Sequence, residues 1–405
     1  MSRKRASPAD RAVTEALVRA VRAAFALESG EIEAVEPPVD FAHIDPSMFG
    51  RAVKIHQVSP LLDEHAAALC MPSELADEMH QLARAETLKA MTLAQETVRA
   101  WSTLTQAGIP ALVMKGVALS MQTTGRPTSR GDGDIDLLVA PEDVPHALEV
   151  LTDAGWNRRM PRELSEDWWP WYSRVNRETP LPGLRSDVDL HWRVTHESQL
   201  MKPTHVLLER SDFIEIGGER VRVLNEDDRL FATCYAFQLD RFSSLRLSLD
   251  VARLVRKRIE LPSAMPRRLR RMVEESIVIS HGQVGGTPRE GFQYLALVRK
   301  SGRTRVRTQA HEPMQTLVNA TAPRGPRTRR SNRTFLVPSI FAQSFKTYRF
   351  DTWRWTGPFR AWLLIVLTNE ELRPALDRRA SKMAMLLTLL ESVPDVVGKR
   401  SSQRI

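Results

Sequence analysis

Two aspartates at the start of an apolar segment are the residues of this chain best suited to chemistry. Asp134 and Asp136 flank one isoleucine, and the apolar run 137–139 follows them. In a strand, side chains two residues apart lie on the same face, roughly 6.5–7 Å from each other. Carboxylates at that spacing repel each other unless a cation lies between them. The pair therefore predicts a site for two divalent ions about 3.5–4 Å apart.

A second acidic segment repeats this spacing. Residues 186–194, SDVDLHWRV, alternate between polar and apolar side chains, which predicts a strand. Asp187, Asp189 and His191 fall on one face of it. If this strand lies beside the first, Asp189 either completes the metal site or activates an acceptor, and His191 contacts the base, the sugar or the acceptor. The same alternation is also common on solvated surfaces, so the inference depends on the two segments together.

Cationic residues near the acids match the needs of a triphosphate. Lys115 and Gly116 end the apolar run 109–114, a predicted strand, and precede a predicted helix. Backbone N–H groups at such a junction favour phosphate. Arg126 and Arg130 lie on the loop before the acids, and Asp132 of the same loop is predicted to contact solvent or the metal ligands. These residues predict phosphoryl or nucleotidyl transfer, which requires cations around the phosphates.

The rest of the chain supplies elements to position these residues. Helical spacing of apolar residues predicts helices within 8–28, 59–107, 225–261 and 358–391. Gly217-Gly218 predicts the turn of a hairpin. Residues 31–58, with Pro37-Pro38, are predicted to form an irregular connection, and no element is assigned within 262–334.

Composition sets further bounds. The chain has 405 residues and a net charge of +9, yet residues 251–350 contain 21 Lys/Arg and only 5 Asp/Glu, so the remainder has a balance of −7. Two cysteines form neither a disulfide framework nor a zinc site alone. No secretory signal is visible, and the strongest apolar run, 361–368, is too short to span a membrane. A reduced cytoplasmic location is expected.

The motifs together resemble the uncharacterised nucleotidyltransferase family of the polymerase-beta-like superfamily. The resemblance covers about residues 60–260 and is carried by MKGVAL (114–119), Arg130, DIDLLV (134–139), AGW (154–156), VDLHW (188–192) and, more faintly, LDVARL (249–254). The family often has histidines in the helix before that last aspartate, whereas this chain has none there.

The resemblance implies an α+β fold: a small mixed sheet flanked by helices, with additional mostly helical N- and C-terminal regions. It also implies transfer of a nucleoside monophosphate from an NTP to a hydroxyl, with magnesium. Asp134 and Asp136 would bind the metals, and Asp189 would bind metal or take the acceptor proton. Lys115 and Arg130 would steady the phosphates. The acceptor is an unidentified small molecule, peptide or protein.

Two alternatives stay open. The chain could be a catalytically silent nucleotide-binding or interaction module, or an RNA-modifying enzyme that uses the basic region 251–350. RNA is not favoured, because no aromatic residue lies among the arginines between 299 and 334. Walker, G-x-S-x-G and H-E-x-x-H motifs are absent from the sequence. The expected domains are an N-terminal helix with its connection (1–58), the transferase-like domain (59–225), a helical extension (226–261), a basic region (262–350) and a C-terminal helical segment (351–405).

Overall fold

The structure is a computed structural model that describes residues 7–35, 39–131, 133–157, 173, 177–195, 200–240, 242–256, 261 and 265–285. The chain divides into two compact units, residues 1–157 with 181–322 and residues 158–180 with 323–405. Almost all of the second unit lies outside the described residues, as do Asp132 and the helix predicted within 358–391. Within the described ranges no helix is long and apolar enough to cross a membrane.

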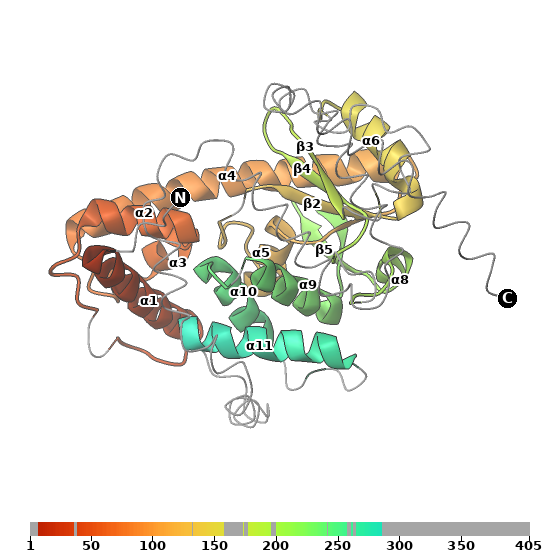
Figure 1. Cartoon of the computed structure of the whole chain (residues 1–405). Helices are drawn as coiled ribbons and strands as arrows, with labels where there is room; N and C mark the ends of the chain where they lie inside the picture. The colour runs from red at the N-terminus through yellow and green to blue at the C-terminus, as the bar shows by residue number, and fades with distance from the viewer. Residues whose placement is uncertain are drawn as a thin grey trace, which may run out of the picture. The chain divides into compact units, whose positions relative to one another are not determined.

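The described residues contain a six-stranded mixed sheet (Figure 1). Its order is β3-β4-β2-β1-β6-β5, and the strands are β1 (Ala111–Val113), β2 (Ile135–Val139), β3 (Glu178–Leu181), β4 (Val188–His191), β5 (Asp212–Ile216) and β6 (Glu219–Val223). β2 pairs in parallel with β4 and antiparallel with β1, while β1 pairs in parallel with β6. β5 and β6 form the predicted antiparallel hairpin, whose turn residues Gly217 and Gly218 both have positive φ.

Helices surround this sheet and complete the α+β fold that the resemblance implied. They are α1 (Pro8–Glu28), α2 (Pro46–His56), α3 (Ser59–Glu64), α4 (Ser73–Gln106), α5 (Val117–Thr124), η1 (Pro141–Asp143), α6 (Val144–Asp153), α8 (Thr204–Glu209), α9 (Glu226–Leu239), α10 (Leu245–Arg256) and α11 (Arg267–Val284). The predicted helix within 8–28 is confirmed, with a capping box between Ser7 and Asp10. The segment 59–107 contains two helices, α3 and α4, as its pattern indicated.

Helices α2 and α11 occupy segments in which the sequence analysis assigned none. The prediction of an irregular connection over 31–58 is wrong for its second half, which forms α2. Asp45 caps this helix, its carboxylate accepting a hydrogen bond from the Met48 N–H, and Pro46 follows as first helical residue. In α11, Ser276 and Ser280 interrupt the apolar pattern although both side chains are buried. Their hydroxyls donate to backbone carbonyls, which is why buried serines are tolerated there.

One hydrophobic core joins the sheet to the helices that follow it. Leu112, Met114 and Leu138 of the sheet region are buried in the same cluster as the apolar residues of α9, α10 and α11. A second cluster contains the apolar residues of α1, α2 and α3 together with Leu245 and Leu249 of α10. Burying each large apolar side chain stabilises the fold by about 1.5–3 kcal/mol. Helix α10 therefore contributes to both clusters.

The long helix α4 contacts both the N-terminal helices and the sheet. Its N-terminal part packs on α2 and α3, and it also contacts β1, β2 and α6, as its course across Figure 1 shows. Its buried residues recur at helical spacing from Leu75 to Leu104, which explains the single uninterrupted helix. Strand β2, which carries Asp136, is thus in contact with this long helix.

Candidate metal and nucleotide site

The pairing of β2 with β4 brings two predicted acids together. Asp136 lies directly opposite Asp189, and the parallel register continues from Ile135 with Val188 to Leu138 with His191. Neighbouring strands are about 4.8 Å apart, and directly opposed residues project from the same face. The register therefore places Asp136 and Asp189 one strand spacing apart on the same face of the sheet.

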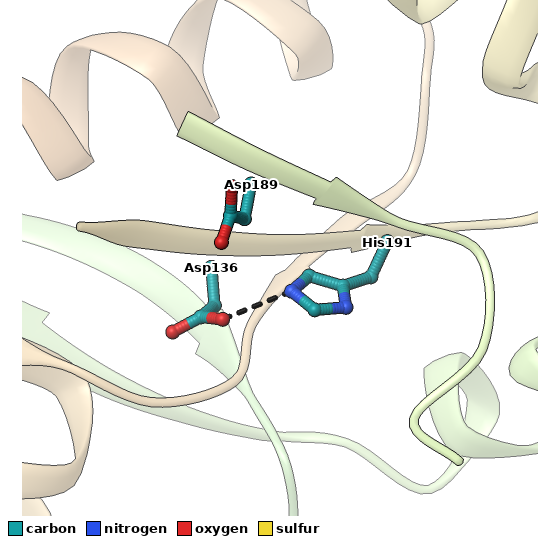
Figure 2. A group of neighbouring side chains, drawn as sticks. All are labelled: Asp136, Asp189 and His191. Carbon is teal, nitrogen blue, oxygen red and sulfur yellow. Dashed lines mark hydrogen bonds and ion pairs between the residues drawn. The ribbon is translucent and has the colours of Figure 1, made fainter. Parts of the chain in front are cut away.

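Asp136, Asp189 and His191 form a tight group (Figure 2). One ligand atom from each residue lies within 4.8 Å of the other two. Asp136 and His191 are buried, and Asp189 is partly buried. Carboxylate oxygens suit magnesium and manganese, whereas an imidazole nitrogen suits zinc, copper, iron and nickel. The donor set of these three residues fits a divalent cation.

The carboxylate of Asp136 receives two hydrogen bonds on one oxygen. The Lys115 ammonium donates to Asp136 Oδ1 over 2.8 Å, and His191 Nε2 lies 2.9 Å from the same atom. Figure 2 shows the histidine ring directed at this oxygen. Burial alone would raise the pKa of Asp136, but the charge of Lys115 and the bond to His191 outweigh it and hold that pKa well below its ordinary value. Asp136 is consequently a carboxylate at every physiological pH.

Asp134 lies at the rim of this group and is not part of it. Its side chain is exposed at the entrance to β2. Desolvation by the surrounding protein, followed by the negative charge of Asp136, raises the pKa of Asp134. Repulsion from a neighbouring carboxylate is the condition that a bound cation relieves. The charge of Asp136 therefore affects the pKa of Asp134. Asp134 directly precedes β2 and is not a member of the tight group.

Lys115 and Gly116 form the predicted junction between strand and helix. Gly116 precedes the first residue of α5 and has φ 62° with ψ −133°, a conformation that disfavours any side chain. The first N–H groups of a helix have no partner within the helix. In α5 these groups begin one residue after Lys115, whose ammonium touches Asp136. The helix start and the acidic group are thus joined through one lysine.

Arg130 has a different partner from the phosphate that the resemblance implied. Its Nε donates to both oxygens of Asp250 in α10, at 3.1 and 2.9 Å, and both side chains are buried. Nearby, Arg246 of α10 donates to the Gly131 carbonyl over 2.7 Å. We call these two contacts the loop clamp. They fix the loop that leads into Asp134, so Arg130 is placed to position the acids.

The clamped loop is also packed closely on its other side. A Cβ atom added to Gly131 would lie 2.6 Å from the Cβ of Gln57 and 3.1 Å from Glu86 Oε2. The contact with Gln57 is too short for a real Cβ atom, so glycine lets the loop approach the end of α2 closely. The sequence analysis missed Arg246 and did not give Asp250 this role. An acid inside the apolar pattern LSLDVARLV was the signal that could have identified the buried ion pair.

Two further candidates lie outside the tight group. Arg126 forms an ion pair with Glu64 over 2.7 Å, and both side chains are well exposed. Asp187 is exposed, and its Oδ1 accepts a 3.3 Å hydrogen bond from the Gly183 N–H. Neither residue belongs to the group around Asp136.

Residues 42–277 match the sequence model of the family described as uncharacterised nucleotidyltransferases. This chain belongs to that family. The matched region contains the whole candidate site together with α2 and most of α11, elements that the sequence analysis did not assign. It also spans the predicted domain boundaries at residues 58 and 225, which remain predictions. No curated protein matches this nucleotidyltransferase family member.

Proposed function

We propose that this protein is a magnesium-dependent nucleotidyltransferase that moves a nucleoside monophosphate from an NTP to a hydroxyl group. The acceptor would be a small molecule, a peptide or a protein. The observation that carries the proposal is the group of Asp136, Asp189 and His191, whose ligand atoms lie within 4.8 Å of one another. Family membership supports nucleotidyl transfer as the chemistry.

The residues fall into three proposed roles. Asp136 and Asp189 would hold a divalent ion, and Asp134 at the rim would contribute to a second one. Two such ions, when bound, stabilise the attacking and leaving oxygens of an in-line displacement. His191 would orient Asp136 through the hydrogen bond to its Oδ1, as partners of metal ligands commonly do.

The phosphates would lie against the start of α5. Lys115 and the first N–H groups of this helix supply positive charge beside the acids. In the proposed reaction an acceptor hydroxyl loses its proton, its oxygen bonds to the α-phosphorus, and the bond to the β-phosphate oxygen breaks to release pyrophosphate. Asp189, which is only partly buried, is our candidate to receive that proton.

The test uses the full-length protein with magnesium and each of the four NTPs labelled at the α-phosphate. Cell extract supplies acceptors, and the labelled product is identified by mass. We expect label in an acceptor and pyrophosphate in equal amount. Triphosphate binding without any transfer in the presence of extract would support the catalytically silent module instead.

A further inference from the structure

The position of the Lys115 ammonium raises a question about metal binding. It lies 2.8 Å from Asp136 Oδ1, and His191 Nε2 lies 2.9 Å from the same oxygen. A carboxylate oxygen has two lone-pair directions, and these two contacts use both. A cation that binds through Oδ1 must therefore displace one of them. The lysine is the better candidate to leave, because its side chain is 20 % exposed whereas that of His191 is fully buried.

We propose that Lys115 is an internal counter-ion of the metal site, which neutralises Asp136 in the absence of ligands and moves to the phosphates when metal and triphosphate bind. This inference rests on the proposed function and adds to it an order of events. The lysine lowers the affinity of the site for a metal ion in the absence of triphosphate. When triphosphate binds, the lysine no longer lowers it.

The position of Lys115 offers its ammonium a second anionic partner, a phosphate bound at the start of α5. The residue directly precedes Gly116, the N-cap of α5, so its side chain starts beside the helix end at which phosphates are favoured. Lysine has a flexible four-carbon stem and a point charge that binds any anion within reach. With a triphosphate at the start of α5, the ammonium would exchange one anionic partner for another without being left unpaired.

Repulsion between the metal ion and the Lys115 ammonium requires the lysine to leave Asp136 when metal binds. A divalent cation on Asp136 and Asp189 would lie within a few ångströms of the ammonium, in a partly buried place where like charges repel strongly. Metal and triphosphate should consequently bind with positive coupling, and this coupling is reciprocal for the two ligands. A lysine that only held phosphate would not weaken the binding of metal alone.

The experiment compares wild type with Lys115→Gln by calorimetry. For Mn²⁺ alone, the variant is expected to bind about tenfold more tightly, equivalent to about 1.4 kcal/mol. For the preformed Mn²⁺ complex of inorganic tripolyphosphate, it is expected to bind about tenfold more weakly. The two effects have opposite signs, which general damage to the site would not produce.

Arg126→Gln is the matched control. It also removes one positive charge, from the loop before the acids, but Arg126 pairs with Glu64 rather than with Asp136. Its two affinities should equal those of wild type. Lys115→Arg, which keeps the charge, tests whether charge rather than side-chain volume opposes the metal, and it should not tighten Mn²⁺ binding. Lys115→Met repeats the main measurement if the glutamine variant unfolds.

The failures of the two proposals differ. If Lys115→Gln binds Mn²⁺ alone equally well or more weakly than wild type, the counter-ion role is overturned while the metal site stands. If wild type binds neither Mn²⁺ nor its tripolyphosphate complex, the proposed function fails and the counter-ion role fails with it.

Discussion

Two buried aspartates, Asp136 and Asp250, each face a cationic side chain, but their environments differ. Asp250 accepts from Arg130 with both oxygens, and the two side chains are 0 % and 2 % exposed. Asp136 uses one oxygen for both Lys115 and His191, and Lys115 is partly exposed. Arg130 and Asp250 form a buried ion pair, whereas Asp136 belongs to a group with Asp189 and His191.

The difference shows how the fold separates support from chemistry. A guanidinium binds a carboxylate in a fixed planar geometry, which suits a permanent contact between a loop and a helix. An ammonium on a flexible stem suits a contact that must change. Asp189 belongs to the same group as Asp136, and burial, followed by the charge of Asp136, raises the pKa of Asp134. The two aspartates thus differ in the kind of cation that faces them.

The largest effect should come from Asp136→Asn. Removing the charge that holds the cation should lower nucleotidyl transfer by about 10³-fold, the upper range for one preorganised electrostatic contact. The measurement is the rate of pyrophosphate release with magnesium and an NTP. Asp187→Asn is the matched control, because Asp187 lies two residues before Asp189 in the same segment but outside the group. Equal losses in both variants would refute the assignment of the site to Asp136.

Breaking the loop clamp should have a smaller effect, and on stability. Arg130→Met leaves the Asp250 carboxylate buried without its arginine, which costs about 3–5 kcal/mol in the free energy of unfolding. Denaturant titration measures this cost. The double variant Arg130→Met with Asp250→Leu should recover most of it, because replacing both partners by apolar residues removes the buried charge. A double variant as unstable as the single one would contradict the role of the pair as a closed structural contact.

The smallest effect concerns His56, which accepts a hydrogen bond from the N–H of Leu245, the first residue of α10. Burial lowers the pKa of His56 to about 4. The unfolded chain takes up this proton near pH 6.5, so between these two values it binds more protons than the folded chain does, and stability falls as pH falls. We expect the unfolding free energy to drop by about 1 kcal/mol from pH 7 to pH 5.5.

Thermal or denaturant unfolding at several pH values checks this expectation, with His56→Asn as the comparison. Asparagine keeps an acceptor for the Leu245 N–H but does not titrate, so its stability should depend less on pH. If the two proteins show the same pH dependence, His56 contributes nothing to it.

The sequence predicted the acid-bearing strands well because each has strong local signals. Apolar runs around 109–114 and 134–140 became β1 and β2, and the alternating run 186–194 contains β4. It was harder to predict which residues form the tight group. The spacing of Asp134 and Asp136 suggested the main pair, whereas the tight group in the structure comprises Asp136, Asp189 and His191. Strand pairing, which a single sequence does not give directly, decides that outcome.

The remaining misses also have physical causes. Helix α2 was hidden by the prolines before it, although Asp45-Pro46 is a good helix start. Helix α11 was hidden by buried serines and by many arginines. Arg130 was predicted to steady the phosphates, and its contact with Asp250, 120 residues away in the chain, was not predicted. The apolar residues around Asp250 mark it as a buried acid, but they do not identify its partner.

The parallel register of β2 with β4 has a consequence for how this protein can change. The spacing of Asp136 and Asp189 is fixed by the hydrogen bonds between two strands and not by the 52 residues between them. Segments inserted into or deleted from that connection would leave the two carboxylates opposite each other. A shift of one residue in the strand pairing would instead turn Asp189 to the opposite face. The length of that connection could thus change while Asp136 and Asp189 stay opposite each other.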